Sequence, residues 1–406
     1  MPHEPHYNEN SIMIKSAKSF LPPLLSLTIL MLGCSAFTTL LTLRIHAEGY
    51  TSWLAGILTA AYYFGFAIGS FETEPLVVRI GLIRSYAALA ALLTAMVLIQ
   101  GLFFIPWLWV VLRFISGICV GTLFIVIQSW LLCYSTSETR GQILAVYMTV
   151  FYASQGFAQL LLFSTDPKAI FFFVLTAIFC ALSIIPVTMT STQSPQIEKR
   201  SPMNLRQLFK ISPVGVLACL FSGGILSCLY GIYPMYISLM GYSIHEVSVV
   251  MAMVIFGCML LQYPAGYISD HVNKRMMLFF LCLINMGICL LVMIFAHHNI
   301  YLFVFLSFLL GGFIAVLYSL GISCSSLNLG QKDMIAATQG LLFAYSLGAV
   351  LGPLTVPLFM RTLGPAGLLM FFMVLLGSIL IIIYIYRNRK PGALAINDVI
   401  SENPSS

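Results

Sequence analysis

The sequence predicts an all-α polytopic membrane protein with twelve transmembrane helices in two six-helix halves. Of its 406 residues, 60% are hydrophobic and only 8% are charged, whereas a soluble domain carries about 25% charged residues. The apolar runs reach the ~20 residues that cross a bilayer as a helix. Because backbone groups in lipid must be hydrogen-bonded within their own segment, we expect these runs to be helices and not strands.

One polar segment separates the apolar runs into two groups of six. The runs lie at 20–43, 51–73, 84–105, 107–133, 141–163, 168–188, 213–240, 244–268, 276–296, 300–324, 334–360 and 366–386. The predicted organisation is a tail at 1–19, a bundle at 20–188, a linker at 189–212, a bundle at 213–386 and a tail at 387–406. The first run is long enough to span, so we interpret it as an uncleaved first helix and not as a signal peptide.

The basic residues predict the orientation of the chain. With the N-terminus inside, the outer loops hold only Arg44, Lys168 and Arg361, and Arg113 lies within a span. The inner segments hold the remaining basic residues: Lys15, Lys18, Arg79, Arg84, Arg140, Lys199, Arg200, Arg206, Lys210, Lys274, Arg275, Lys332, Arg387, Arg389 and Lys390. Under the positive-inside rule both termini are therefore cytoplasmic. This distribution also accounts for the net charge of +6 without a nucleic-acid partner.

Motifs for metals, cofactors and common enzymes are missing from the sequence. The ten cysteines are scattered through or beside the apolar runs without a CxxC pair, so neither disulfides nor a zinc site is predicted. There is no Gly-x-x-x-x-Gly-Lys-(Ser/Thr) phosphate loop and no Gly-x-Ser-x-Gly elbow, which argues against ATP hydrolysis and that serine chemistry. We predict no enzyme activity, no cofactor and no metal.

A shift of 192 residues reveals an internal repeat. It places Gly81 on Asn273 and Val78 on Asp270 in one part of the chain, and it pairs Phe151 with Phe343 in another. The same shift pairs Ser154 with Ser346 and Gly156 with Gly348. One shift that aligns two separate places indicates two six-helix halves related by duplication; chance matches in apolar sequence are the alternative.

The stretch Gly266–Arg275 resembles the loop signature of the major facilitator superfamily, Gly-x-x-x-Asp-(Arg/Lys)-x-Gly-(Arg/Lys)-(Arg/Lys). With the twelve helices and the basic linker, the resemblance covers nearly the whole chain. Further stretches resemble a little-characterised bacterial inner-membrane subgroup of this superfamily: Arg79–Gly81, Arg113–Gly117, Leu229–Pro234, Gln262–Gly266 and Gly348–Pro353.

The chain also departs from the family pattern at several positions. His271 replaces the first basic residue of the signature and Asn273 its second glycine. In the matching loop of the first half, Val78 stands where the family has an aspartate, and Glu74 replaces a glycine. The fifth run lacks the Gly-Pro-x-x-Gly-Gly sequence that is typical of proton–drug antiporters, which weakens a drug-export interpretation.

Polar and aromatic side chains within the spans are the candidates for substrate binding. A charge in a membrane span is costly, so Arg113 is expected to face a cavity or a partner; snorkelling to the surface is the alternative. The predicted substrate-binding residues are Arg113, Gln128, Tyr152, Gln155, Tyr230 and Tyr318. Ser227 and Tyr233 share a helix face with Tyr230, and Thr28 and Thr42 belong to a weaker polar stripe, because threonine can bond its own helix.

Two further roles are assigned to charged residues near the predicted inner surface. Glu72 is the proton-coupling candidate, since burial raises the pKa of a carboxyl group toward neutrality; interfacial solvation is the alternative. Asp270 is placed to meet the positive end of the fifth helix and Arg140, and so to act as a conformational latch. The predicted latch residues are Arg79, Gly81, Arg84, Arg140, Gly266, Asp270, Lys274 and Arg275.

The resemblance implies a secondary active transporter of the bacterial inner membrane that works by alternating access. The expected partners are a small organic solute, the lipid bilayer and protons, and the functional unit is expected to be a monomer. Efflux of amphipathic compounds and uptake of a metabolite or siderophore both remain open. A non-transporting membrane sensor or scaffold is the alternative from another class, and a membrane-embedded transferase is a weaker one.

Overall fold

The computed structural model describes residues 9–133, 135, 139–163, 166–190, 208–209, 211–326 and 334–386. Within its helices, the side chains of Glu72, Arg140 and Asp270 lie outside the described part. Residues 1–8 of the first predicted tail, most of the predicted linker and the whole of the second predicted tail also lie outside it.

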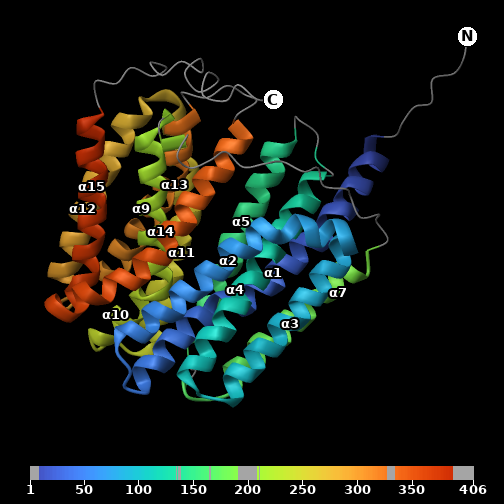
Figure 1. The fold of residues 1–406 in the computed structure, drawn as a ribbon, viewed down its shortest axis with the longest axis horizontal. Coiled ribbons are helices and arrows are strands. Elements are labelled where there is room, and N and C mark those ends of the chain that lie inside the picture. Colours follow the sequence, from blue (N-terminus) through green and yellow to red (C-terminus); the bar gives the residue numbers. More distant parts are fainter. Residues whose placement is uncertain are drawn as a thin grey trace, which may run out of the picture. The chain divides into compact units, whose positions relative to one another are not determined.

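The described residues form helices and no strand (Figure 1). The helices of the first half are α1 (Glu9–Ala47), α2 (Ser52–Ile80), α3 (Leu82–Leu102), α4 (Pro106–Cys133), α5 (Arg140–Leu160), α6 (Phe171–Leu182) and α7 (Ile184–Thr188). Those of the second half are α9 (Pro213–Gly231), α10 (Tyr233–Leu239), α11 (Ile244–His271), α12 (Lys274–Phe295), α13 (Ile300–Ser326), α14 (Met334–Leu363) and α15 (Gly367–Ile385).

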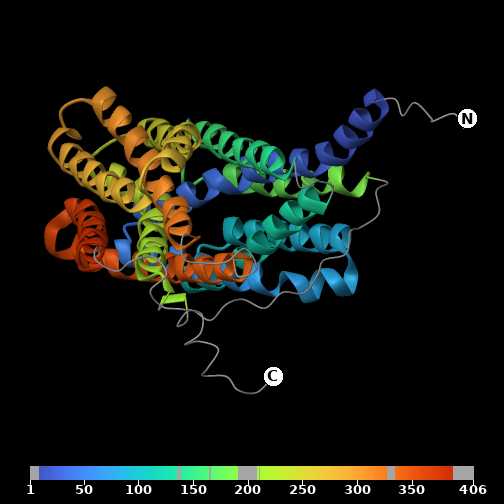
Figure 2. The same cartoon turned by 90° about the horizontal axis from the view of Figure 1, so that it is seen from above.

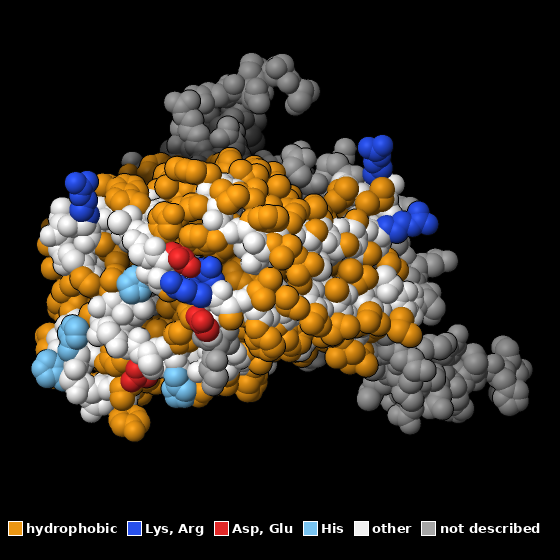
Figure 3. All heavy atoms as spheres, turned by 90° about the horizontal axis from the view of Figure 1, so that it is seen from below, with side chains coloured by type: hydrophobic (Ala, Val, Ile, Leu, Met, Phe, Trp, Pro, Cys, Tyr) orange, Lys and Arg blue, Asp and Glu red, His pale blue; other side chains and the backbone are white. Residues whose placement is uncertain are grey.

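These helices account for twelve membrane crossings. Eleven described stretches are long and apolar enough to span, and the last of them, Ala337–Ile385, has 49 residues. A single crossing needs ~20 residues, and the 3₁₀ turn Gly364–Ala366 divides this stretch into α14 and α15. Wide areas of the surface in Figure 3 are hydrophobic and the charged side chains there are few, as a bilayer requires. The predicted fold class is confirmed.

The repeat is visible in the bounds of the helices themselves. Adding 192 to the bounds of α2 gives 244–272, and α11 runs from Ile244 to His271. The same shift takes α3 to 274–294, and α12 runs from Lys274 to Phe295. The two halves therefore place their second and third helices in the same register.

The contacts divide the chain into two compact units that do not coincide with the two halves of the sequence. The first unit consists of Met1–Phe37, Gly65–Ala158 and Ala169–Lys199, and the second of Thr38–Phe64, Gln159–Lys168 and Arg200–Ser406. In the first unit, α3 packs against α4, α6 and α7. In the second, α9 packs against α13 and α14, and α11 against α13 (Figures 1 and 2). The second unit also contains the ends of α1 and α5 and the start of α2.

Glycines allow the closest helix contacts in both halves. A Cβ at Gly65 in α2 would collide with the carbonyl oxygen of Phe114 in α4. Its repeat mate Gly257 in α11 meets the carbonyl oxygen of Phe308 in α13 in the same way. Small residues let helix backbones approach in membranes, where apolar burial alone gives little attraction between helices.

Candidate functional site

Arg113 is buried inside the first unit. Its side chain is 3% exposed, and it is the only lysine, arginine, aspartate or glutamate that is buried among the residues whose side chains the structure describes. It lies two turns into α4, and Ser116 one turn further on is buried as well. The structure therefore places this charge within protein and away from the lipid-facing surface, as its cost in lipid demands.

Two of the other predicted residues of the first unit lie on α5. Gln155 is half-buried, and its backbone carbonyl accepts a hydrogen bond from Ser35 Oγ on α1 at 3.3 Å. Its Nε2 also lies 3.9 Å from Met31 Sδ, so α1 and α5 are joined at this level. Tyr152 on α5 and Gln128 on α4 are half-buried.

Tyrosines gather in the second unit. Tyr230 of α9 is half-buried, with its hydroxyl 3.5 Å from Cys258 Sγ of α11. The Tyr318 ring of α13 lies 4.8 Å from that of Tyr345 in α14. Tyr345 is half-buried like Tyr318. It was not predicted from the sequence, because it stands in a long apolar run without a polar neighbour on its face. Three helices thus contribute aromatic rings with hydroxyl groups.

Other polar residues considered for binding have structural partners instead. Ser227 is fully buried and donates to the carbonyl of Gly224 in its own helix at 3.1 Å. Tyr233 is fully buried, with its hydroxyl 2.8 Å from Ser307 Oγ. Thr28 donates to the carbonyl of Leu24 at 2.9 Å, which is the helix back-bonding that threonine commonly shows.

Within the second unit, the end of α1 is bonded to α9 and α10. Thr42 Oγ1 donates to the carbonyl oxygen of Gly231 at 2.7 Å, and His46 Nδ1 lies 3.0 Å from Ser238 Oγ. His46 and Ser238 are 192 residues apart, so they are repeat mates in contact. Equivalent residues of two copies related by a two-fold axis can be in contact only where they lie next to that axis.

The same unit holds further contacts between the two halves of the sequence. A Cβ on Gly231 would collide with the side chain of Thr59 in α2. Ser248 Oγ of α11 donates to the carbonyl of Gln159, which belongs to α5. We call the contacts of Thr42, His46, Thr59 and Ser248 the closing contacts. They could not be predicted from the sequence, because isolated polar side chains of this kind form no motif.

Next to the closing contacts lies the one cluster of ion pairs among the described side chains. Arg44 Nε is 3.0 Å from Glu48 Oε1, and Lys168 Nζ is 3.8 Å from Glu48 Oε2. Arg44 also donates to the carbonyl of Pro167 at 3.2 Å. These bonds join the connection after α1 to the connection after α5. Opposite charges lie close together on the face shown in Figure 3.

The two repeat-related loops with the predicted latch residues differ in their backbone. Gly81 precedes α3 with φ +87° and ψ 159°, a region that is essentially restricted to glycine. Its mate Asn273 has φ −63°, and its Oδ1 accepts from the backbone N–H groups of Arg275 and Met276 at 3.0 and 3.3 Å. Asn273 is therefore the N-cap of α12.

The remaining latch residues have varied surroundings. Arg79 and Arg84 are exposed, while Lys274 and Arg275 are half-buried. Arg275 Nη1 donates to the carbonyl of Tyr386 at 3.4 Å. A Cβ on Gly266 would meet no heavy atom within 4 Å. The side chains of Arg140 and Asp270 lie outside the described residues, as does that of Glu72.

The described side chains include no group of three or more histidine, cysteine, aspartate or glutamate residues arranged to hold a metal ion. The ten cysteines are free thiols. Cys34 and Cys180 come within 3.8 Å of each other in the first unit.

A helical membrane protein with two repeats of six crossings and polar groups buried in its spans has the architecture of a transporter. The chain belongs to the Major Facilitator Superfamily: the model of that family matches residues 24–255 and 216–401. Its members are transporters and not enzymes, so this chain is a membrane transporter. The resemblance inferred from the sequence is confirmed.

Relatives in enterobacteria carry the name uncharacterized MFS-type transporter YcaD. The protein of Escherichia fergusonii is 28% identical over 371 residues, which cover 90% of this chain and 94% of that protein. A protein of Escherichia coli is 26% identical over 364 residues, covering 89% and 94%. They support the predicted membership of a little-characterised bacterial subgroup.

Solved structures agree on the fold at low sequence identity. A bacterial homologue of the human lysosomal transporter Spinster, in an inward-facing and unoccupied conformation, has a TM-score of 0.68 at 13% identity and covers 91% of this chain and 94% of its own. The nucleoside transporter NupG has a TM-score of 0.73 at 10% identity, covering 91% and 98%. At these identities the likeness concerns the fold alone.

Proposed function

We propose that this protein is a secondary active transporter that moves a small organic solute across the bacterial inner membrane by alternating access. The closing contacts are the observation that carries the proposal. They include the hydrogen bonds of Thr42 and Ser248 to backbone carbonyls and the contact of His46 with Ser238, and a side-chain hydrogen bond contributes only ~0.6 kcal/mol on average in a membrane protein. Such bonds can be broken and remade as the two halves move, whereas a large apolar interface would hold one state.

We take the closing contacts as one gate of the alternating-access cycle. With the proposed orientation, both termini are cytoplasmic and this gate lies on the outer side. The support is the distribution of basic residues, since the outer loops hold only Arg44, Lys168 and Arg361 of the nineteen lysines and arginines. Arg44 and Lys168 share Glu48 in the structure, which neutralises part of the charge on that side.

The solute is proposed to be an amphipathic organic compound. Arg113, Gln128, Tyr152 and Gln155 are the proposed binding residues of the first unit, and Tyr230 and Tyr318 those of the second. The buried guanidinium of Arg113 suits an acidic group, because arginine presents several N–H donors to a carboxylate or phosphate. The half-buried tyrosines of the second unit, each with a large apolar ring and one hydroxyl group, by themselves suit an amphipathic compound. Export and import are both compatible with these residues.

Proton coupling through Glu72 is the proposed energy source. A carboxyl group that is buried in one state and solvated in the other changes its proton affinity between states. The test is proton-driven flux in the Glu72→Gln variant: flux equal to that of the unaltered protein would remove Glu72 from the mechanism.

The loops after α2 and α11 are proposed to form the inner latch, with Asp270 and Arg140 as its charged pair. Spin-label distances across the inner side test this proposal. We expect the Asp270→Asn variant to shift the populations toward the inward-open state. Unchanged populations would show that Asp270 is an ordinary loop carboxylate.

The decisive experiment for the transport proposal is a substrate screen in inverted vesicles, with and without a proton gradient. The panel should contain organic acids and amphipathic compounds, and the Arg113→Gln variant serves as the control for specific binding. Gradient-dependent flux that this variant lacks supports the proposal. The absence of any gradient-sensitive flux over a broad panel would favour the second candidate function, a membrane sensor or scaffold. The observation that supports this candidate is Val78, which replaces the aspartate of the family signature.

A further inference from the structure

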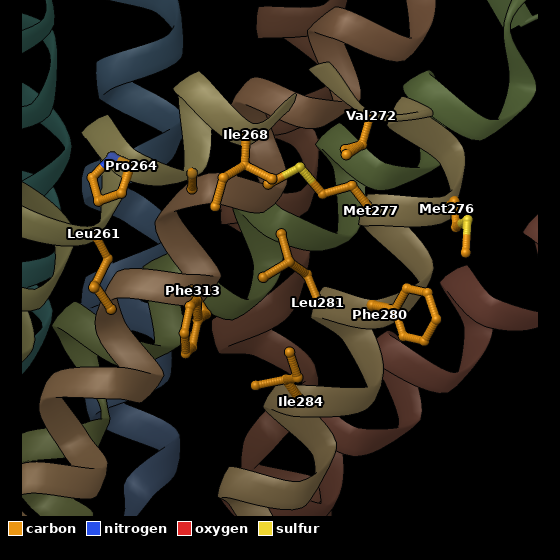
Figure 4. Close-up of a pocket in the computed structure, with 11 residues that line it drawn as sticks. Leu261, Pro264, Ile268, Val272, Met276, Met277, Phe280, Leu281, Ile284 and Phe313 are labelled. Atoms are coloured by element: carbon orange, nitrogen blue, oxygen red, sulfur yellow. The ribbon is translucent and has the colours of Figure 1, made fainter. Parts of the chain in front are cut away.

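An apolar groove opens between α11 and α12, directly below the loop that connects them (Figure 4). Its volume is about 420 Å³, within the ~300–1,000 Å³ of small-molecule pockets. We call it the α11–α12 groove. Its lining residues are Leu261, Pro264, Ala265, Ile268, Val272, Met276, Met277, Phe280, Leu281, Ile284 and Phe313.

The lining follows one face of each helix. On α12 the pairs Met276–Phe280 and Phe280–Ile284 are four residues apart, which puts them on one face. α12 packs against α13 and α15 and makes few contacts with α11, so the space between α11 and α12 remains open. Phe280 and Ile284 are 48% and 45% exposed. The groove therefore opens on the outer surface of the helix bundle, where the bilayer lies.

The groove has the depth of one lipid leaflet. From Met276 to Ile284 it follows eight residues of α12, which is ~12 Å at 1.5 Å per residue. Half of the ~30 Å hydrocarbon core is ~15 Å. A groove lined only by apolar side chains over this depth fits a hydrocarbon chain lying along the membrane normal.

Two basic residues, Lys274 and Arg275, begin α12 at the loop end of the groove. Lys274 precedes Met277 by three residues and Leu281 by seven, so it shares the face of α12 that lines the groove. Side chains at a helix start tilt toward the N-terminus, here toward the membrane surface. Arg275 follows directly but donates to the carbonyl of Tyr386, so Lys274 is the residue available to a head group; basic pockets between transmembrane helices bind anionic lipid head groups. Asp270 belongs to the same loop, and its side chain lies outside the described residues.

Several apolar side chains that line this groove are not kept at the repeat-related positions of the first half. The shift of 192 puts Glu72 in place of Pro264, Arg84 in place of Met276 and Gly121 in place of Phe313. Two charged residues and one glycine therefore stand where the groove has three apolar side chains. The apolar lining of the groove is thus specific to the sequence of the second half.

We propose that the α11–α12 groove binds one acyl chain of an anionic phospholipid whose phosphate is held by Lys274. The apolar lining selects a hydrocarbon chain, the depth matches one leaflet, and the lysine at the mouth selects a negative head group. The site is independent of the transported solute, so it stands or falls separately from the proposed transport function.

Native mass spectrometry of the purified full-length protein tests the site with phosphatidylglycerol and phosphatidylcholine as probes. We expect one tightly retained phosphatidylglycerol. The Lys274→Gln variant should weaken its binding about fivefold, which corresponds to the ~1 kcal/mol of one basic residue near a membrane surface. Arg84→Gln, an exposed arginine at the start of the repeat-related helix α3, is the matched charge control and should leave binding unchanged.

A second pair of variants tests the acyl chain. Ile284→Trp fills the groove and should remove the retained lipid, whereas Leu291→Trp, seven residues further on the same face and 42% exposed, should not. Equal binding of phosphatidylglycerol and phosphatidylcholine, or equal lipid loss in both tryptophan variants, would mean that ordinary surrounding lipid covers this face and would overturn the proposal. A loss in Arg84→Gln as large as in Lys274→Gln would also overturn it.

Discussion

The loops before α3 and α12 are repeat mates, and they solve the same turn in two ways. Gly81 uses a backbone conformation with φ +87° that other residues avoid. Asn273 keeps an ordinary φ of −63° and uses its side chain to cap α12. The departure from the family glycine at Asn273 is therefore not a loss of function in the turn. Two copies of a duplicated loop can therefore start the same helix differently: one through a backbone conformation that only glycine adopts readily, the other through a side-chain hydrogen bond.

The largest expected effect concerns a feature that both halves have kept. Gly65→Leu and Gly257→Leu should each destabilise the protein by about 3 kcal/mol, near the top of the overpacking range, because each side chain would collide with a backbone carbonyl of α4 or α13. Thermal unfolding in detergent measures this loss, with a thiol-reactive dye that reports on the eight buried cysteines. Gly266→Leu is the control, since a Cβ there meets nothing within 4 Å.

Gly81→Ala should cost about 2 kcal/mol, because alanine is strained at this φ and ψ. The same unfolding assay measures the loss. The Gly81→Asn variant should be destabilised as well. Asn273 caps α12 from a backbone conformation that differs from that of Gly81, so an asparagine at position 81 would be strained. If Gly81→Asn is as stable as the unaltered protein, the two loops are interchangeable and the comparison fails.

Asn273→Ala should cost about 1 kcal/mol, the usual loss of an N-cap. Asn273→Gly should cost only a few tenths of a kcal/mol, as glycine is a tolerated cap residue. The unfolding midpoints should rank the unaltered protein first, then Asn273→Gly, then Asn273→Ala. A glycine variant less stable than the alanine variant would contradict the capping role.

The smallest effect is expected where the two repeats touch. His46→Ala and Ser238→Ala should show a coupling of about 0.6 kcal/mol in a double-mutant cycle, the average for side-chain hydrogen bonds in a membrane protein. Stability in detergent measures it, and the pair Thr28→Ala and Ser238→Ala, which share no contact in the structure, serves as the uncoupled control. Additive effects of His46→Ala and Ser238→Ala would show that the two side chains act independently.

The number of crossings and the repeat could be predicted because they depend on long apolar runs and one constant shift. The burial of Arg113 followed from the cost of a charge in lipid. The closing contacts could not be predicted, since Thr42, His46 and Ser248 make them through bonds without a sequence motif. Helix periodicity placed Ser227 and Tyr233 on the face of Tyr230, but α9 is surrounded by α13 and α14, so a single polar face could not be assigned from period alone.

The contact of His46 with Ser238 also bears on the origin of the chain. If the two halves arose from a symmetric dimer, the residue at this position once faced its own copy across the axis. Two histidines at this position would repel each other when both are positively charged. Two serine side chains would be too short to span the same distance. A single substitution in one copy converts the self-facing position into a ring nitrogen opposite a hydroxyl group, an arrangement that two identical chains cannot encode.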